Sequence, residues 1–328
     1  MKPFSTAESA FKSDQYTIRK AVVPGSLCEV QTYRLPMSRQ LQLATAQSNK
    51  LAMSDRPEPC ATIGLKERLV GRDAESPHAG VLILNADDWG RDSETTDRTL
   101  ECIRCMAVSS VSSMVFMEDS GRAALIAQER GIDTGLHLNF TTAFSAPGTP
   151  ARLAEHQQRL SRYFRRHRLA QVLFHPGLTD SFHYVVAKQV DEFTRLYGQR
   201  PDRIDGHHHV HLCANVILAG LLPAGTIVRR NFSFRRGEKS WVNRFYRHIV
   251  DRRLARRHRV TDLFFSLPPL DADRLARIFS LAHRFVIEVE THPVRPEEFR
   301  FLAGGEIFRC TGDLPVAPGF AIHRPEHA

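Results

Sequence analysis

The chain has 328 residues, of which 42% are apolar and 25% are charged, and its formal net charge is +9. This composition is ordinary for a globular protein, and the length suits either two average domains or one α/β barrel. The sequence contains no run of about 18 apolar residues, which argues against a membrane span. The N-terminus also lacks an apolar stretch long enough for a secretory signal, so we expect a cytoplasmic protein.

The first 79 residues differ from the rest of the chain. They are rich in Ser, Gln, Thr and Ala and show no sustained periodicity. We expect residues 1–79 to form a poorly structured N-terminal extension and residues 80–328 to form one domain. Met53 offers an alternative start, so whether residues 1–52 are translated stays open.

From Gly80 onward, strand-like and helix-like segments alternate. Short apolar runs predict strands over residues 81–85, 111–117, 134–140, 204–211 (with the loop that follows it), 226–230, 263–267 and 285–290. Helical spacing predicts helices over residues 93–106, 122–130, 182–197, 215–222, 241–257 and 272–283. Such repeated units predict a parallel sheet covered by helices. Polar residues at the strand ends favour a closed or nearly closed barrel over an open doubly wound sheet.

Two adjacent carboxylates, Asp87 and Asp88, directly follow the apolar run at residues 81–84. Adjacent carboxylates in a partly buried site repel each other, so we expect one to shift its pKa or to bind a cation. The ordinary alternative is that both only cap the next helix. Their position after a buried strand and before Trp89-Gly90 favours a functional pair.

Histidines follow other predicted strands. His137 alternates with leucines along its strand, and a lone histidine of this kind is more often a hydrogen-bonded core residue. The run His207-His208-His209-Val210-His211 is the densest cluster of donors in the chain. Its first, third and fifth residues share a face if the run is extended, and its first and fifth do so in a helix, so both geometries include His207. We expect Asp205 to orient one of the imidazoles.

His292 follows the last predicted strand, in Glu290-Thr291-His292-Pro293. The proline restricts the backbone of His292 to extended conformations. A histidine with a pKa near neutrality can protonate an amine leaving group, although a plain loop histidine is the ordinary alternative. Arg229 stands at another strand end, and we expect it to contact substrate oxygens.

These strings, in this order, resemble the YdjC-like (ChbG/HpnK) carbohydrate deacetylases over residues 80 to about 300. The most specific pieces are Asn85-Ala86-Asp87-Asp88-Trp89-Gly90 and residues 205–211. The resemblance implies an irregular (βα) barrel with the active site at the C-terminal ends of the strands. It also implies a metal-dependent hydrolase that removes an acetyl group from an N-acetylated sugar or a lipid-linked amino sugar.

The resemblance assigns one divalent metal ion, Mg²⁺ or Zn²⁺, to Asp88, His137 and His207. Asp87 is then the base that takes a proton from the metal-activated water, and His292 is the acid that protonates the departing amine. Imidazole ligands favour Zn²⁺ by their softness, whereas the family implies Mg²⁺. Two alternatives stay open. One is a metal hydrolase of another amide or ester, and the other is a non-catalytic sugar- or nucleic-acid-binding protein that uses its basic helices.

Basic residues concentrate at residues 152–168 and 229–259. Such surfaces can bind nucleic acid, anionic lipid or a phosphorylated sugar carrier. The chain shows no aromatic-interleaved RNA motif and no helix-turn-helix signature, which argues against nucleic acid. We expect arginine-rich, solvated helix faces, while a peripheral membrane contact and the oligomeric state stay open.

Overall fold

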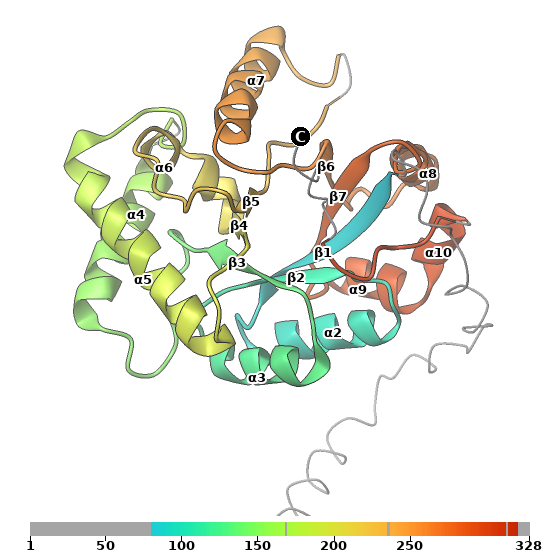
Figure 1. Ribbon diagram of the computed structural model, residues 1–328, viewed down its shortest axis with the longest axis horizontal. Coiled ribbons are helices and arrows are strands. Elements are labelled where there is room, and N and C mark those ends of the chain that lie inside the picture. The colour runs from blue at the N-terminus through green and yellow to red at the C-terminus, as the bar shows by residue number, and fades with distance from the viewer. Residues whose placement is uncertain (1–79, 168, 235–236, 313, 321–328) are drawn as a thin grey trace, which may run out of the picture. The chain divides into compact units, whose positions relative to one another are not determined.

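The structure is a computed structural model, and it describes residues 80–167, 169–234, 237–312 and 314–320. The predicted extension at residues 1–79 lies outside these ranges. Within them the chain alternates between strands and helices, as the sequence predicts (Figure 1). None of the helices in the described ranges is both long and apolar enough to cross a membrane.

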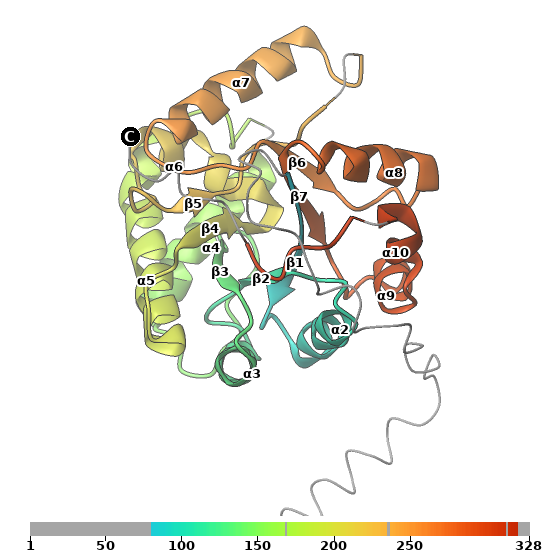
Figure 2. The same ribbon diagram turned by 45° about the vertical axis from the view of Figure 1, so that its right-hand side comes forward.

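Seven strands form one sheet. They are β1 (Val81–Trp89), β2 (Ser110–Ser113), β3 (Thr134–Leu138), β4 (Arg203–Gly206), β5 (Ile227–Val228), β6 (Leu263–Ser266) and β7 (Val286–Thr291). Every pairing is parallel, in the order β5-β4-β3-β2-β1-β7-β6. The sheet curls into a half-barrel whose edge strands are β5 and β6 (Figure 2). The predicted α/β fold with an irregular barrel-like sheet is confirmed, and the sheet is open between those two edges.

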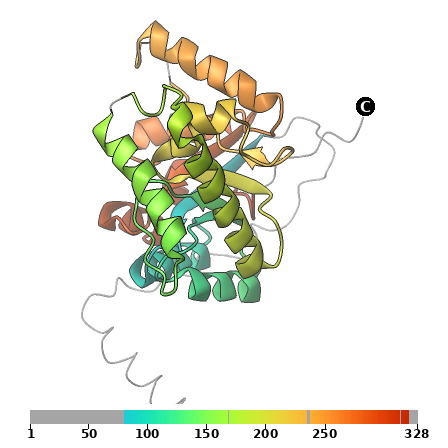
Figure 3. The same ribbon diagram turned by 90° about the vertical axis from the view of Figure 1, so that its left-hand side faces the viewer.

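Helices flank the curved sheet, and one of them projects beyond it at one end of the domain (Figure 1). They are α2 (Ser93–Arg104), α3 (Ser120–Arg130), α4 (Ala151–Arg166), α5 (Thr179–Tyr197), α6 (Ala214–Leu218), α7 (Trp241–Ala255), α8 (Ala272–Leu281), α9 (Pro296–Ala303) and α10 (Glu306–Thr311), with short 3₁₀ helices η1 (Pro176–Leu178) and η2 (His207–Leu212). Helices α4 and α5 pack side by side against one flank of the sheet (Figure 3). The sequence analysis did not predict α9 and α10. The predicted end of the helix at residue 197 is confirmed, because Gly198 follows α5 in a left-handed conformation with a φ of 74°.

Alternation along the strands divides apolar from polar side chains. In β1, Leu82 and Leu84 belong to a buried apolar cluster that also includes residues of α2, α8 and α9. Leu136 of β3 and Ile204 of β4 belong to a second cluster with α4 and α5. Successive side chains of a strand point to opposite faces of its sheet. The residues between these apolar ones therefore face the inside of the half-barrel, and most of them are polar.

Candidate active site

The two adjacent carboxylates lie at the C-terminal end of β1. Asp87 and Asp88 are each 2% exposed. The pairing of β1 with β2 is irregular between Ala86 and Trp89, and Asp88 has a φ of 66°. A non-glycine residue in this left-handed region is uncommon and strained, and such strain concentrates at functional sites. The irregularity directs the two carboxylates to different partners.

Asp88 meets two histidines from other strand ends. Its Oδ1 lies 2.8 Å from Nδ1 of His207, the first residue after β4. The same oxygen lies 3.4 Å from Nε2 of His137, on β3. The three ligand atoms all lie within 4.8 Å of one another, and the three residues are buried. The structure thus brings together Asp88, His137 and His207, the residues that the sequence analysis put forward as metal ligands.

The polar atoms of this cluster suit a bound cation. Asp88 Oδ1 is buried, and its short contacts with the two histidines lack hydrogen-bond geometry, a costly arrangement unless a cation satisfies the oxygen. Burial alone would raise the pKa of Asp88, but contacts with His137 and His207 hold it well below its ordinary value. Burial would lower the pKa of His137, but the carboxylates of Asp205 and Asp87 raise it to about 10. The site therefore stabilises positive charge at the point where the three ligand atoms meet.

Asp205 fixes the orientation of His137. Its Oδ1 lies 2.7 Å from His137 Nδ1, and its Oδ2 accepts a hydrogen bond of 2.6 Å from Ser112. A carboxylate bound to one ring nitrogen leaves the other nitrogen free for a metal, and it also raises its basicity. The sequence analysis expected Asp205 to orient one of the imidazoles, and that imidazole is His137.

Asp87 is held by Arg229, which follows β5. Arg229 Nη1 donates to Asp87 Oδ2 and Nη2 donates to Asp87 Oδ1, each at 2.7 Å. The same guanidinium lies 2.6 Å from Glu288, 2.7 Å from Asp205 and 3.5 Å from Glu290. Arg229 is 1% exposed. The expectation that Arg229 contacts substrate oxygens is therefore wrong, because its donors are directed at buried carboxylates.

The pKa values of these carboxylates differ. Burial would raise the pKa of Asp87, but Arg229 and His137 outweigh burial and lower it. Burial raises the pKa of Glu288 to about 7 despite its contact with Arg229. Asp87 thus stays ionised at neutral pH. The interior of the half-barrel holds more carboxylates than this one guanidinium balances, which favours a further cation in the site.

The histidine run folds as η2 and not as an extended segment or an α-helix. His208 and His209 have φ values of 57° and 56°, which turn the chain sharply after β4. His207 then faces Asp88, while His211 is buried with Nε2 3.0 Å from the carbonyl oxygen of Arg229. His208 Nδ1 lies 3.0 Å from the hydroxyl of Thr141. Only His207 of the run belongs to the group of candidate ligands.

His292 is half-buried just beyond the end of β7. Ala86 of β1 pairs with Thr291, so His292 stands at the register of Asp87 on the neighbouring strand. The backbone N–H of His292 donates to Glu298 at 2.7 Å, and its Nδ1 is buried without a hydrogen-bond partner. The position suits a side chain that exchanges a proton with something bound next to Asp87.

Two partners of the aspartates were missed by the sequence analysis. Arg91 donates to Asp88 Oδ2 at 2.8 Å, and Asn85 donates to Asp87 Oδ1 at 2.9 Å. Asn85 lies two residues before Asp87 and therefore on the same face of β1. Strand alternation could have revealed Asn85, whereas the contact of Arg91 depends on the turn after β1.

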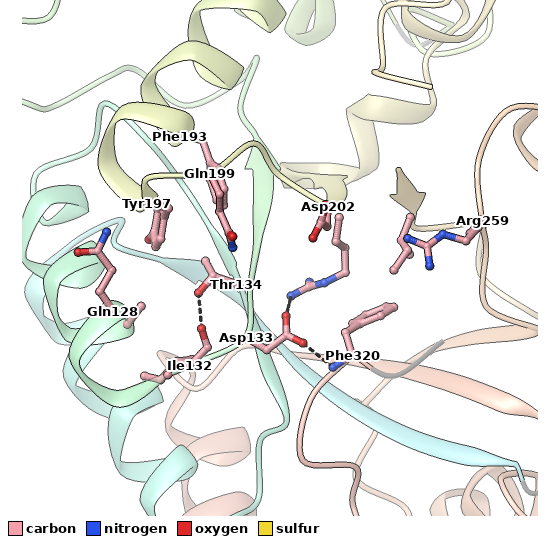
Figure 4. Close-up of a pocket in the computed structure, with 14 residues that line it drawn as sticks. Gln128, Ile132, Asp133, Thr134, Phe193, Tyr197, Gln199, Asp202, Arg259 and Phe320 are labelled. Carbon is pink, nitrogen blue, oxygen red and sulfur yellow. Dashed lines mark hydrogen bonds and ion pairs between the residues drawn. The ribbon is translucent and has the colours of Figure 1, made fainter. Parts of the chain in front are cut away.

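A separate cavity of about 590 Å³ lies at the other end of the sheet. Thr134 and Arg203, which line it, are the first residues of β3 and β4. Asp133 bonds the guanidinium of Arg203 at 3.3 Å and the backbone N–H of Phe320 at 2.7 Å, as Figure 4 shows. Asp88 and its neighbours lie at the C-terminal strand ends, so this cavity is not part of the candidate site.

The fold and the site define an α/β half-barrel with a buried Asp-His-His group at the C-terminal ends of its strands. A family model described as "YdjC-like protein" matches residues 81–306, and the chain belongs to that family. The matched range contains every candidate site residue. The resemblance to the YdjC-like family that the sequence motifs indicated is confirmed.

Several curated relatives carry deacetylase names. A chitooligosaccharide deacetylase of Serratia marcescens is 29% identical over 133 residues, which are 40% of this chain and 51% of that protein. A chitooligosaccharide deacetylase of Proteus mirabilis is 31% identical over 135 residues, 41% of this chain and 51% of that one. A carbohydrate deacetylase of Mus musculus is 28% identical over 141 residues, 41% and 44% of the two chains. The chain thus spans about half the length of the curated relatives it matches.

One solved structure supports the fold. A protein of Enterococcus faecalis V583, named for a proposed cleavage of cellobiose phosphate, superposes with a TM-score of 0.51. Its sequence identity is 16%, and the match covers 73% of this chain and 96% of that one. At this identity the likeness supports the half-barrel architecture alone.

Proposed function

We propose that this protein is a metal-dependent deacetylase that hydrolyses the acetamide of an N-acetylated amino sugar. The observation that carries the proposal is that one ligand atom each from the buried Asp88, His137 and His207 lie within 4.8 Å of one another, next to the ionised Asp87. The deacetylase names of the relatives support the substrate class. Free oligosaccharides and lipid-linked amino sugars both carry the acetamide that this chemistry requires.

The proposed ligands are one carboxylate and two imidazoles, from Asp88, His137 and His207. When bound there, a divalent ion supplies Lewis acidity, which lowers the pKa of a water molecule and polarises the acetyl carbonyl. Three protein ligands leave coordination positions open for water and substrate. Both Zn²⁺ and Mg²⁺ are candidates, and the two imidazoles favour Zn²⁺.

Asp87 is the proposed general base. A carboxylate has about four positions that can accept hydrogen bonds. Arg229 and Asn85 together occupy three of them, two on Oδ1 and one on Oδ2. The remaining position is on Oδ2, which lies 3.9 Å from His137 Nε2 and so borders the candidate ligands. Asp87 is thus placed to accept the proton of a water molecule that attacks the acetyl carbon.

His292 is the proposed general acid. The pairing of β1 with β7 aligns His292, just after β7, with Asp87 of β1. Its Nδ1 makes no hydrogen bond, so this ring nitrogen is available to transfer a proton. As the C–N bond of the acetamide breaks, His292 donates a proton to the leaving nitrogen. The products are acetate and a free amino sugar.

A chelation experiment tests the proposal. The full chain is treated with EDTA and then supplied with Mg²⁺, Mn²⁺ or Zn²⁺, and acetate release is measured from N-acetylated chitooligosaccharides. We expect release to stop on chelation and to return with at least one ion. Turnover of another amide or ester, with none of any N-acetylated sugar, would move the assignment to a different hydrolase. Sugar binding that survives both chelation and Asp87→Asn, without turnover, would indicate a non-catalytic binding protein.

A further inference from the structure

Helix α7 exposes apolar side chains that most soluble helices bury. Trp241 is 77% exposed and Phe245 is 60% exposed, and Val242 and Ile249 are also exposed. At about 100° per residue, these four positions fall on one face of the helix. The sequence predicted a helix over residues 241–257 with an arginine-rich, solvated face, and in α7 only Val250 and Leu254 are buried. The larger part of its apolar surface faces outward.

The same outward face becomes basic toward the C-terminal end of the helix. Arg252 and Arg256 are exposed and continue the face that Trp241 and Phe245 begin. Arg244 and Arg253 are also exposed, on either side of it. The acidic residue of α7, Asp251, accepts hydrogen bonds from Arg230 and Asn231 and so does not balance these charges. Aromatic residues beside unbalanced arginines are typical of helices that lie in a membrane interface.

The inner side of α7 fixes the helix to the domain. The contacts of Asp251 tie it to the segment directly after Arg229, at the C-terminal end of β5. A groove of about 600 Å³ is lined by Phe232 and Phe234, by Trp241 and Phe245 of α7, and by basic residues, so the aromatic residues of the outer face also border this groove. Helix α7 projects at one end of the domain in all three views (Figures 1, 2 and 3). A flat surface could therefore reach its outer face.

A second exposed apolar segment precedes α5. Leu169, Leu173 and Phe174 are exposed. Between them, Gln171 donates to the carbonyl of His208 at 3.2 Å, so this segment lies on η2, which follows β4. Both apolar segments thus belong to the end of the half-barrel at which the strands terminate.

We propose that the outer face of α7 docks on an anionic lipid bilayer, with its aromatic residues in the interface and its arginines at the headgroups. Charge favours this occupant over a second copy of the chain, because α7 offers no free carboxylate that could pair with its exposed arginines across a two-fold contact. Residues 1–79 contain more Lys and Arg than Asp and Glu, so charge also disfavours them as a cover. The proposal goes beyond deacetylation and does not depend on it.

Binding to vesicles tests the proposal. The full chain is sedimented with vesicles of phosphatidylcholine alone or of phosphatidylcholine with 30% phosphatidylglycerol. We expect binding to the second kind, which weakens with added salt. The chain has two tryptophans, and Trp89 is fully buried, so a blue shift of the emission on binding reports Trp241.

Matched variants separate the two parts of the face. Trp241→Glu with Phe245→Glu should abolish binding, whereas Leu125→Glu, at an exposed leucine of α3, should not change it. Arg252→Glu with Arg256→Glu should weaken binding about thirtyfold or more, since each basic residue near an anionic surface contributes on the order of 1 kcal/mol. Arg104→Glu with Arg130→Glu makes the same charge change on α2 and α3 and should have a much smaller effect.

Three results would overturn the docking proposal. The first is an absence of sedimentation with phosphatidylglycerol vesicles. The second is equal binding by the Trp241 and Phe245 double variant. The third is evidence that protein already covers the face in the absence of vesicles. Such evidence would be a dimer that dissociates in the double variant, or protection of Trp241 fluorescence from quenching by acrylamide. Acetate release from a water-soluble substrate is measured on the same samples. This release tests the proposed deacetylase activity, whereas sedimentation with vesicles tests docking, so the two proposals can fail independently.

Discussion

Asp87 and Arg229 face each other through two nitrogen–oxygen contacts of 2.7 Å, although 142 residues separate them in the chain. One stands on β1 in the middle of the sheet and the other follows β5 at its edge. The pair bridges the inside of the half-barrel. The position and charge of the proposed base therefore depend on how the edge of the sheet is held.

Replacing Asp87 by asparagine should separate binding from chemistry. Asp87→Asn keeps the size of the side chain and removes its basic oxygen, so turnover should fall by about two orders of magnitude or more. The metal content should stay near that of the wild type, because Asp88, His137 and His207 are unchanged. Acetate release and elemental analysis of the same sample make the measurement. Turnover near that of the wild type would rule out Asp87 as the base.

Replacing Arg229 should affect both stability and the base. Arg229→Met leaves several buried carboxylates without their guanidinium, which should cost about 3 to 5 kcal/mol of unfolding free energy. Arg229→Lys keeps the charge but loses the two-pronged contact with Asp87. The pKa of Asp87 should then rise, and the acidic limb of the kcat/KM profile should move to higher pH.

The control for the two Arg229 variants is Arg230→Lys. Arg230 bonds Asp251 and backbone carbonyls of the 261–262 segment, not Asp87, so its variant should keep the pH profile of the wild type. An unshifted profile in Arg229→Lys would show that Arg229 has only a structural role.

The proposed ligands can be tested by elemental analysis of protein purified without a histidine tag. We expect close to one divalent ion per wild-type chain. Single alanine substitutions at Asp88, His137 and His207 should each remove most of it. His156→Ala removes an imidazole of α4 that contacts Ser181 and should not change the metal content. Full occupancy in all three ligand variants would contradict the assignment.

His211 should make the fold sensitive to mild acid. Burial lowers the pKa of His211 to about 3, below its ordinary value of 6.5. Above pH 6.5 the residue is neutral in the folded and the unfolded chain and has no effect. Between pH 6.5 and 3 the unfolded chain binds a proton that the folded chain does not. Stability should therefore fall as pH falls, by up to about 1.4 kcal/mol per pH unit from this residue.

Urea denaturation at pH 7.5, 6 and 5 measures this effect. His211→Gln lowers stability at every pH but should make the loss below pH 6.5 shallower than in the wild type. His283→Gln, at an exposed position beyond α8, should keep the wild-type slope. Parallel slopes for the wild type and His211→Gln would show that His211 is not the group responsible.

Strand and helix periods predicted most of this fold. Alternation at His137 placed this residue correctly on β3, whereas Asp87, predicted to follow a strand that ends at residue 85, lies within the longer β1 near its C-terminal end. Parallel strands bring their C-terminal ends to one edge. The sequence could not show the path of η2. His208 and His209 have left-handed φ values. The contacts that accompany this turn are with residues distant in the chain, such as that of His208 with Thr141, and no local pattern predicts them.

The role of Arg229 also could not be predicted from the sequence. Its partners come from β1, β4 and β7, and no local pattern connects them. A signal was nevertheless present, because Asp205 and Glu288 each alternate with apolar residues in short strands. Charged residues at inward positions of several strands predict a polar barrel interior, and such an interior requires a balancing guanidinium or cation.

The edges of the sheet, β5 and β6, are not joined to each other, and the chain between them carries the loop after Arg229 and the whole of α7. In a closed barrel every strand pairs with a neighbour on both sides, so the sheet has no edge. Here the segment between Asn231 and Leu263 adds no strand to the sheet, although a bridge from Arg259 to Ile227 and a hydrogen bond from Ser233 to Phe264 attach it to the two edges. A change in the length of α7 therefore leaves the strand pairs that hold the Asp-His-His group intact, and the open side of the sheet lets this outer helix vary while the group keeps its position.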